Sequence, residues 1–206
     1  MLKPLKPLVL AALLCAAAGS QAAITVYTSQ ADFLAATSAP GYDSYDDLTV
    51  DLLGDTLDRT AGGYGYQAYS FGGLYGAGTG TDHWLSTNVR TDPIEFRNFS
   101  SGVSAFGGNF FASDIAGEYV ASGNLVLTAS DGSTLTYALN NATQGSFVGF
   151  VSDAALSSVT LATDGGLYWP TANDVVLAAA VPEPATYGML LAGLGFVGAI
   201  ARRRRG

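Results

Sequence analysis

The chain of 206 residues has one cysteine and one histidine, and both shortages exclude classes of function. A single histidine cannot form a histidine pair around a metal ion, and a Ser-His-Asp arrangement would have to be built entirely around His83. No serine lies in a G-x-S-x-G elbow. We therefore expect His83 to be a surface or loop residue and the protein not to be an enzyme.

Basic side chains are also scarce in the central part of the chain. Residues 23–180 carry 16 acidic side chains and three basic ones, a net charge of −13; the basic residues are Arg59, Arg90 and Arg97. A surface this acidic repels nucleic acid and anionic lipid. It suits divalent cations, neutral glycans or simple solubility outside the cell. We expect no nucleic-acid partner.

Residues 1–22 have the three parts of a secretory signal peptide. Two lysines precede an apolar run at residues 8–18, and small residues stand at the −3 and −1 positions before the bond that follows Ala22. We predict an N-terminal signal helix that is cleaved after Ala22. Because Cys15 leaves with it, the mature chain has no thiol, which excludes disulfides, cysteine-zinc sites and cysteine nucleophiles.

Residues 181–206 combine a polar motif, an apolar run and a cationic end. The motif opposes helix formation because two of its residues are prolines; it consists of Pro182, Glu183 and Pro184. Residues 185–201 carry no charge, and an unbroken helix of this length would span roughly 25 Å, near the lower limit for a bilayer core of about 30 Å. Four cations then act as a membrane stop on the cytoplasmic side: Arg202, Arg203, Arg204 and Arg205. We predict a C-terminal transmembrane helix with the Pro-Glu-Pro motif at its outer end.

This order of elements resembles the PEP-CTERM sorting signal of Gram-negative bacteria, although a plain C-terminal anchor remains an alternative. The resemblance covers about an eighth of the chain. It implies that an exosortase, a membrane cysteine transpeptidase, recognises the motif. It also implies export through the inner membrane as a membrane-anchored precursor, followed by sorting to the cell surface or extracellular matrix. Proteins with this signal are typically associated with exopolysaccharide and biofilm.

The composition of residues 23–180 favours one all-β domain, because glycine, serine, threonine and aromatic residues are abundant while helical periodicity is scarce. Residues 124–129 and 134–139 alternate on both sides of an Asp-Gly turn, which is a strong hairpin signal. We predict further strands at 102–111 (with a bulge or tight bend at Gly107-Gly108), 145–150, 156–161 and 174–178.

One helix is expected at residues 29–36, where Ser29 can cap the first turn and Phe33 and Leu34 would face the core. Three further segments resemble a recurrent exported domain that accompanies this sorting signal: Tyr27-x-Ser29-x-x-x-Phe33, F-G-G-N-F-F-x-x-D-x-x-G at 106–117, and G-F-V-S-D at 149–153. The resemblance implies a jelly-roll-like β-sandwich ectodomain at 23–180, related in shape to galactose-binding modules. Shape alone does not confer binding.

Residues 61–80 are rich in glycine and aromatic side chains. Aromatic rings can stack on sugar faces, and the candidate glycan contacts are Tyr64, Tyr66, Tyr69 and Tyr75. The same residues, with Phe71, can equally alternate along a strand packed into the sandwich or belong to a loosely ordered loop. The segment leaves these alternatives open.

An acidic segment provides candidate ligands for calcium, a cation that prefers six to eight oxygen atoms: Asp43, Asp46 and Asp47. The spacing does not fit an EF-hand, and solvated loop carboxylates are the simpler interpretation. We expect no cofactor beyond this candidate structural calcium.

These observations favour a non-enzymatic exported surface or extracellular-matrix protein that an exosortase sorts. The alternative is a carbohydrate-binding module that tethers polysaccharide at the cell surface. A hydrolase is the least favoured function.

Overall fold

The computed structural model describes residues 23–121, 123–181 and 193–194, and within these ranges the chain is almost entirely β-structure. The helical elements are α2 (Gln30–Ala35) and the 3-10 turn η1 (Asp164–Gly166). The strands are β1 (Ile24–Tyr27), β2 (Thr37–Asp43), β3 (Leu52–Ala61), β4 (Tyr64–Thr79), β5 (Asp82–Thr87), β6 (Ile94–Arg97), β7 (Ala105–Ser113), β8 (Tyr119–Val120), β9 (Gly123–Ser130), β10 (Thr134–Ala142), β11 (Phe147–Ser152), β12 (Ser158–Thr163) and β13 (Trp169–Ala180).

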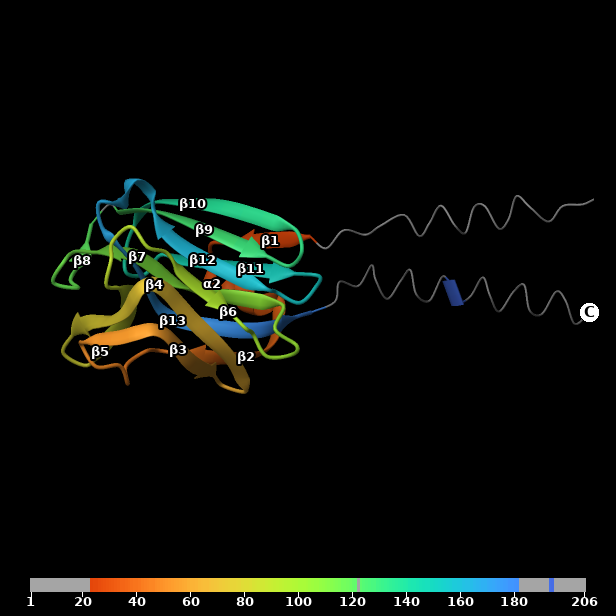
Figure 1. Cartoon of the computed structure of the whole chain (residues 1–206). Helices are drawn as coiled ribbons and strands as arrows, with labels where there is room; N and C mark the ends of the chain where they lie inside the picture. The colour runs from red at the N-terminus through yellow and green to blue at the C-terminus, as the bar shows by residue number, and fades with distance from the viewer. Residues whose placement is uncertain (1–22, 122, 182–192, 195–206) are drawn as a thin grey trace, which may run out of the picture.

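The strands form one antiparallel sheet that folds over on itself into two layers. Its order is β1-β11-β7-β13-β5-β4-β6-β12-β9-β10, with β2 on β13, β3 on β4 and β8 on β7. β7 packs against β9 and β12 against β13 across the interior. Figure 1 shows the two layers, with β9, β10 and β12 in one and β13 and β2 in the other. The predicted all-β sandwich is therefore confirmed, while the finer jelly-roll likeness stays a prediction.

β4 carries the chain from one layer to the other. Gln67–Tyr69 pair with β6, whereas Leu74–Thr79 pair with β5. Between these stretches the register against β3 shifts, and Gly73 takes a φ of 98° that side chains disfavour. β5 in turn pairs with β13 only at Ala172 and Leu85. β4 therefore joins the two layers, and the seam between β5 and β13 within one of them is narrow.

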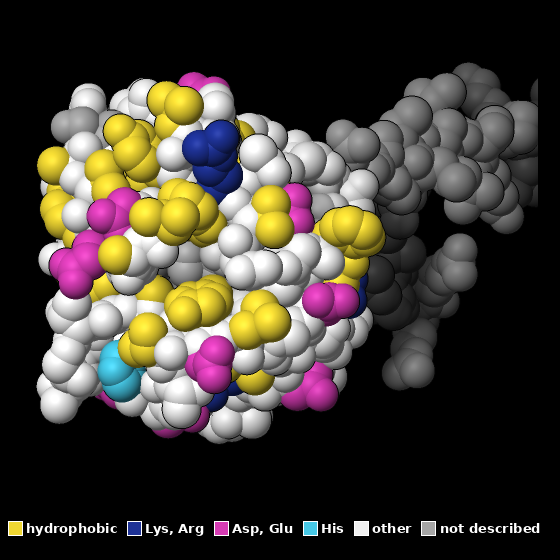
Figure 2. Space-filling model, turned by 60° about the vertical axis from the view of Figure 1, so that its left-hand side comes forward, with side chains coloured by type: hydrophobic (Ala, Val, Ile, Leu, Met, Phe, Trp, Pro, Cys, Tyr) yellow, Lys and Arg dark blue, Asp and Glu magenta, His cyan; other side chains and the backbone are white. Residues whose placement is uncertain are grey.

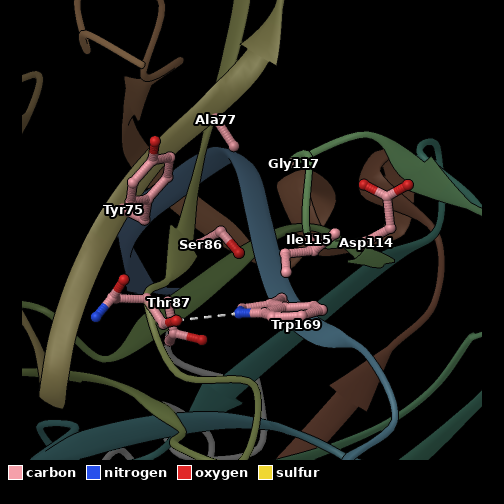
Figure 3. A pocket seen from close by; sticks show the side chains of 9 residues that line it. Tyr75, Ala77, Ser86, Thr87, Asp114, Ile115, Gly117 and Trp169 are labelled. Atoms are coloured by element: carbon pink, nitrogen blue, oxygen red, sulfur yellow. Dashed lines mark hydrogen bonds between the residues drawn. The ribbon is translucent and has the colours of Figure 1, made fainter. Parts of the chain in front are cut away.

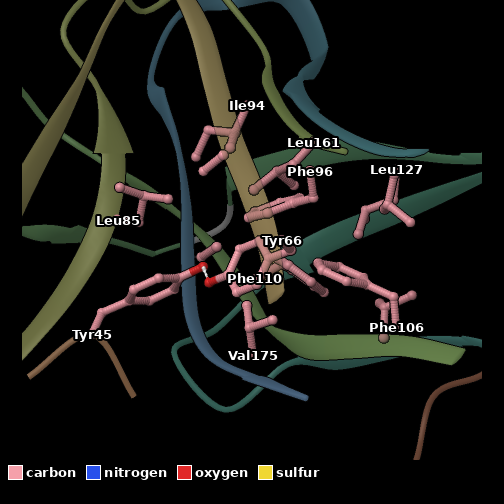
Figure 4. Close-up of a cluster of buried hydrophobic side chains, with 14 of the residues drawn as sticks. Tyr45, Tyr66, Leu85, Ile94, Phe96, Phe106, Phe110, Leu127, Leu161 and Val175 are labelled. Carbon is pink, nitrogen blue, oxygen red and sulfur yellow. Dashed lines mark hydrogen bonds between the residues drawn. The ribbon is translucent and has the colours of Figure 1, made fainter. Parts of the chain in front are cut away.

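The core between the layers is aromatic. Phe96 and Phe106 are fully buried with ring centroids 4.8 Å apart, and Phe110 stacks 6.3 Å from Phe106. Tyr66 of β4 adds a ring 6.2 Å from Phe96, and Figure 4 shows these rings gathered with the aliphatic side chains around them. Such pairs contribute about 0.5–1.5 kcal/mol each beyond the burial of their area.

The predicted hairpin and helix are confirmed. β9 and β10 pair from Thr134 opposite Ser130 to Leu139 opposite Leu125, and Gly132 in the turn has a φ of 107°. Ser29 caps α2, since its side chain accepts a hydrogen bond from the Asp32 amide at 3.4 Å.

The irregularity predicted at Gly107-Gly108 lies opposite these residues, in the neighbouring strand β13, where the register against β7 shifts between Asn173 and Val176. β7 itself pairs regularly with β11. Glycine is needed at 107 for close packing: a Cβ there would lie 2.7 Å from Cζ of Phe147. β13 also begins at Trp169, five residues before the predicted start of the last strand.

The chain enters and leaves the sandwich at the same end. β1, β11, β7 and β13 alternate in direction, so the start of β1 and the end of β13 lie at the same end of the domain (Figure 1). Within the described ranges no helix is long and apolar enough to cross a bilayer. The predicted signal peptide at 1–22 lies outside the described residues, as does the predicted membrane helix at 185–201 apart from residues 193–194.

Candidate functional site

A cleft of about 260 Å³ opens where β5 and β13 diverge, and it is the candidate site of this domain. β4 supplies Tyr75 to it, β5 supplies Ser86, the turn between β7 and β8 supplies Asp114, and β13 supplies its first residue, Trp169. The full lining is Tyr75, Ala77, Ser86, Thr87, Asn88, Asp114, Ile115, Gly117 and Trp169. We call this the cleft below.

Two aromatic side chains form part of the walls of the cleft. The Trp169 indole Nε1 donates a hydrogen bond to the Asn88 carbonyl oxygen at 3.3 Å, which fixes the orientation of the ring. Within the described part of the chain, the hydroxyl of Tyr75 has no hydrogen-bond partner. Figure 3 shows Tyr75 and Asp114 on opposite sides, with Ser86 and Trp169 between them. The cleft therefore presents one oriented ring and one free phenolic hydroxyl.

A triangle of buried hydroxyl groups lies beneath the cleft. Ser113 Oγ and Thr171 Oγ1 are 2.8 Å apart, and Ser86 Oγ lies 3.3 Å from Thr171 Oγ1 and 3.4 Å from Ser113 Oγ. Ser86 Oγ also donates to the Pro170 carbonyl oxygen at 3.2 Å. These bonds connect β5, β7 and β13 at a place where β5 and β13 have little backbone pairing. They also give each buried hydroxyl group a hydrogen-bond partner.

The β7–β8 turn forms the rim. Asp114 Oδ1 accepts hydrogen bonds from the amides of Ala116 (2.8 Å) and Glu118 (3.0 Å), while its Oδ2 has no partner within the described residues. Gly117 has a φ of 78°, and its carbonyl oxygen accepts a hydrogen bond from the buried Trp84 indole at 3.0 Å. The turn is therefore held against β5, and Asp114 Oδ2 remains available to a ligand.

Several large apolar residues are exposed to solvent, with these exposed fractions: Phe71 (80 %), Ile115 (86 %), Leu167 (65 %) and Tyr168 (37 %). Figure 2 shows hydrophobic side chains gathered on the face that carries the β5 and β8 end of the sandwich. Ile115 belongs to the lining of the cleft. The rim of the cleft therefore carries at least one exposed apolar side chain, that of Ile115.

The four tyrosines predicted to contact glycan lie in different environments. Tyr75 lines the cleft, and Tyr64 is partly buried against the main core. Tyr69 lies beneath the guanidinium of Arg97, which is 4.0 Å from the ring centroid. Tyr66 is 4 % exposed and points into the core. The structure brings only one of the four to the cleft.

Trp169 is the cleft residue that the sequence interpretation missed. The available signal is the pair of aromatic residues at 168–169, placed between two glycines and Pro170. It went unused because the last strand was predicted to begin at residue 174. Asn88 and Asp114 carry no signal of this kind, since the cleft assembles them from distant segments.

Two of the predicted calcium ligands bind an arginine instead. Arg59 Nε donates to Asp43 Oδ2 at 2.9 Å, and Arg59 Nη1 donates to Asp47 Oδ2 at 2.7 Å. Tyr66 donates its hydroxyl to Asp43 Oδ2 at 2.7 Å, and the Tyr45 and Tyr66 hydroxyl oxygens are 2.7 Å apart (Figure 4). We call Asp43, Tyr45, Asp47, Arg59 and Tyr66 the Arg59 cluster. It ties the segment after β2 to β3 and β4.

The pKa values in the Arg59 cluster follow from burial and pairing. Burial, reinforced by the Asp43 carboxylate, raises the pKa of the Tyr45 hydroxyl, so the phenol is neutral. Hydrogen bonds from Arg59 lower the pKa of Asp47. The hydrogen bonds to Asp47 and Asp43 raise the pKa of Arg59, which keeps it charged. The cluster is a paired ionic network with its charges fixed.

Asp46, the third predicted ligand, turns toward His83. The His83 ring Nδ1 lies 3.0 Å from the Asp46 carbonyl oxygen, and the His83 amide donates to Asp46 Oδ1 at 3.4 Å. Across the described residues, no three His, Cys, Asp or Glu side chains gather in a way that could hold a metal ion. His83 is partly exposed and belongs to β5 rather than to a loop, where it anchors the segment after β2.

Comparison with known proteins identifies the end of the chain. A family model described as the PEP-CTERM protein-sorting motif matches residues 180–205, most of which lie outside the described residues. No curated protein matches the chain. Among solved structures, the chain is similar to the CBM22-1 xylan-binding domain of Paenibacillus barcinonensis Xyn10C, with 14 % identity and a TM-score of 0.34 over 68 % of this chain and 94 % of that one. The family match shows that this chain carries a PEP-CTERM sorting motif, the signal of exported, membrane-anchored precursors that exosortases sort to the cell surface.

Proposed function

We propose that this protein is a non-enzymatic surface or extracellular-matrix component of a Gram-negative bacterium. An exosortase recognises Pro182-Glu183-Pro184 and processes the chain near this motif, and the ectodomain then resides in the exopolysaccharide or biofilm layer. The match of the sorting motif at residues 180–205 is the observation that carries this proposal.

The charge distribution supports it. Six of the nine basic residues lie in the two ends of the chain, where signal peptides and membrane stops require them, and the domain between them has a net charge of −13. A strongly acidic domain stays soluble and does not adhere to anionic lipid. The chain therefore has a domain suited to the extracellular medium and ends suited to the membrane.

Replacement of Pro182, Glu183 and Pro184 by alanine in the native host tests the sorting step. The expected result is a precursor that keeps its unprocessed mass and stays in the membrane fraction, because the motif recognised by the exosortase is gone. Mass spectrometry and cell fractionation measure both. Pro40→Ala, which removes an exposed proline from β2, is the control and should be processed normally. Unchanged processing and location of the triple variant would contradict the proposal.

A second function, the tethering of polysaccharide, is favoured by the cleft. Its lining combines Trp169 and Tyr75 with hydroxyl and carboxylate groups, the mixture that sugar recognition needs. A module of this kind would hold the exported domain within a glycan matrix after its release from the membrane.

A further inference from the structure

We propose that the cleft binds one or two units of a neutral polysaccharide, with Trp169 as the stacking platform. The inference deepens the proposed function, on which it rests, by assigning the glycan contact to particular side chains. It moves that contact away from Tyr64, Tyr66 and Tyr69 and retains Tyr75.

The ring of Trp169 is prepared for stacking before any ligand arrives. Its Nε1 hydrogen bond to the Asn88 carbonyl and its place as the first residue of β13 hold the indole in one orientation. A pyranose ring has an apolar C–H face that packs on an aromatic surface, while its hydroxyls remain at the edge for polar contacts. A fixed ring loses little conformational freedom on binding, which favours affinity.

The polar atoms of the cleft suit the hydroxyls of a sugar. Tyr75 offers a hydroxyl and Asp114 offers Oδ2, and both lack partners within the described residues. They lie on opposite sides of Ser86 in Figure 3. A phenol can donate and accept, whereas a carboxylate accepts charge-assisted hydrogen bonds. Ligand sites typically have this form, in which a few placed polar groups accompany apolar walls.

Charge and size restrict the ligand further. The lining contains one carboxylate and neither lysine nor arginine, within a domain of net charge −13, so an anionic sugar is repelled. The volume of about 260 Å³ lies just below the range of about 300–1,000 Å³ that is typical for drug-sized ligands. A single unit or a pair of units from a neutral chain therefore fits better than a long or acidic segment.

Tryptophan fluorescence of the full-length chain tests this inference. The chain has two tryptophans, and Trp84 is only 2 % exposed, so a change in emission on binding reports Trp169. The protein is kept in a detergent without a sugar headgroup, because a glycoside detergent would itself compete. The probes are cellohexaose, laminarihexaose and maltohexaose, with hexagalacturonate as the anionic comparison. We expect saturable binding of a neutral hexaose that is unchanged between about 50 and about 500 mM salt, and no binding of hexagalacturonate.

Three variants locate the binding. Trp169→Ala should weaken binding of the neutral hexaose by about tenfold or more in calorimetry, whereas Trp169→Phe should keep part of the affinity because a ring remains. Phe71→Ala is the matched control, since it removes an aromatic ring that is 80 % exposed on β4 but does not line the cleft. It should bind as the unchanged protein does. Thermal melting of each variant confirms that it is folded.

The outcomes separate this inference from the sorting proposal. If none of the three neutral hexaoses binds, the inference is overturned, while processing at the Pro-Glu-Pro motif is unaffected. If a hexaose binds equally well to Trp169→Ala, or if Phe71→Ala loses the binding instead, the glycan site lies elsewhere and the assignment to the cleft is wrong. Preferential binding of hexagalacturonate also overturns it.

Discussion

The Arg59 cluster and the cleft use similar side chains in opposite ways. In the Arg59 cluster the buried Asp43 carboxylate receives donors from Arg59 and Tyr66, so its polar atoms bind one another. In the cleft, the Tyr75 hydroxyl and Asp114 Oδ2 lack partners within the described residues. A satisfied network stabilises a fold, whereas free polar atoms on a rigid frame are available to a ligand. This difference is the reason that we propose a stabilising role for the Arg59 cluster and a binding role for the cleft.

The largest effect is expected from Arg59→Ala. This change leaves the Asp43 side chain, which is 3 % exposed, buried without its cationic partner. We expect a loss of about 3–5 kcal/mol in the free energy of unfolding, measured by urea denaturation, with unchanged hexaose binding by any molecules that remain folded.

Arg97→Ala is the matched control for that experiment. Arg97 pairs with Glu95 at 3.2 Å, but both side chains are about a third exposed. Its loss should cost about 1–2 kcal/mol, because solvent screens such a pair and the contact of the guanidinium with the Tyr69 ring adds only about 0.5–1 kcal/mol. Equal losses from the two arginine variants would break the proposed distinction between a closed cluster and an ordinary surface pair.

A smaller effect is expected from Thr171→Val, which tests whether the floor of the cleft is structural. The change keeps the shape of the side chain but removes the partner of Ser113 Oγ at 2.8 Å. We expect a loss of about 1–2 kcal/mol in the free energy of unfolding. Hexaose affinity should change less than about threefold, because Thr171 lies beneath the lining. A large loss of affinity without a loss of stability would contradict the division of roles.

The smallest effect concerns Asp174, at the irregularity of β13. Partial desolvation of its side chain, which is exposed on one side of β13, raises its pKa above the ordinary value of 3.8, and the nearby Asp82 and Asp46 reinforce this. A raised pKa means that the folded state favours the protonated form, so this contribution to stability is present below pH 3.8 and is lost as the pH rises. Asp174→Asn should therefore raise the melting temperature at pH 7, and the gain should vanish as the pH falls below 3.8.

The backbone permits this substitution, because Asp174 has a φ of 48°, a conformation that asparagine also accepts, and Asn109 can still donate to the side-chain oxygen. Asp164→Asn, which removes the same charge from the exposed turn η1, is the control and should leave the melting temperature nearly unchanged. A gain for Asp174→Asn that is equally large at acidic pH would show that the charge is not its cause.

Local signals predicted the elements that local interactions determine. The Asp131-Gly132 turn specified the β9–β10 hairpin, and Ser29 specified the start of α2. β4 was left ambiguous for a physical reason. Small residues such as Ala68 and Ser70 occupy its buried positions while Phe71 is exposed, and the change of pairing partner near Gly73 interrupts the period of two. The pattern that usually identifies a strand was therefore weak.

The candidate site was less accessible to sequence interpretation than the fold. The aromatic content of residues 61–80 correctly drew attention to Tyr75, but the other walls come from Ser86, Asp114 and Trp169, which meet only after long-range strand pairing. The acidic segment offers candidate calcium ligands in the sequence, because carboxylates alone do not reveal that Arg59 reaches two of them. Non-local contacts of this kind carry no signature in a single sequence.

The direction of β13 places Trp169 and the start of the C-terminal tail at opposite ends of the domain. Trp169 begins this strand and Ala180 ends it, and the eleven steps between them, at about 3.3 Å each, separate the two ends by roughly 36 Å. A tether attached after Val181 would therefore hold the domain by the end that lies opposite Trp169. The indole of Trp169 would then lie at the end of the domain away from the membrane, where a ligand in the surroundings could reach it.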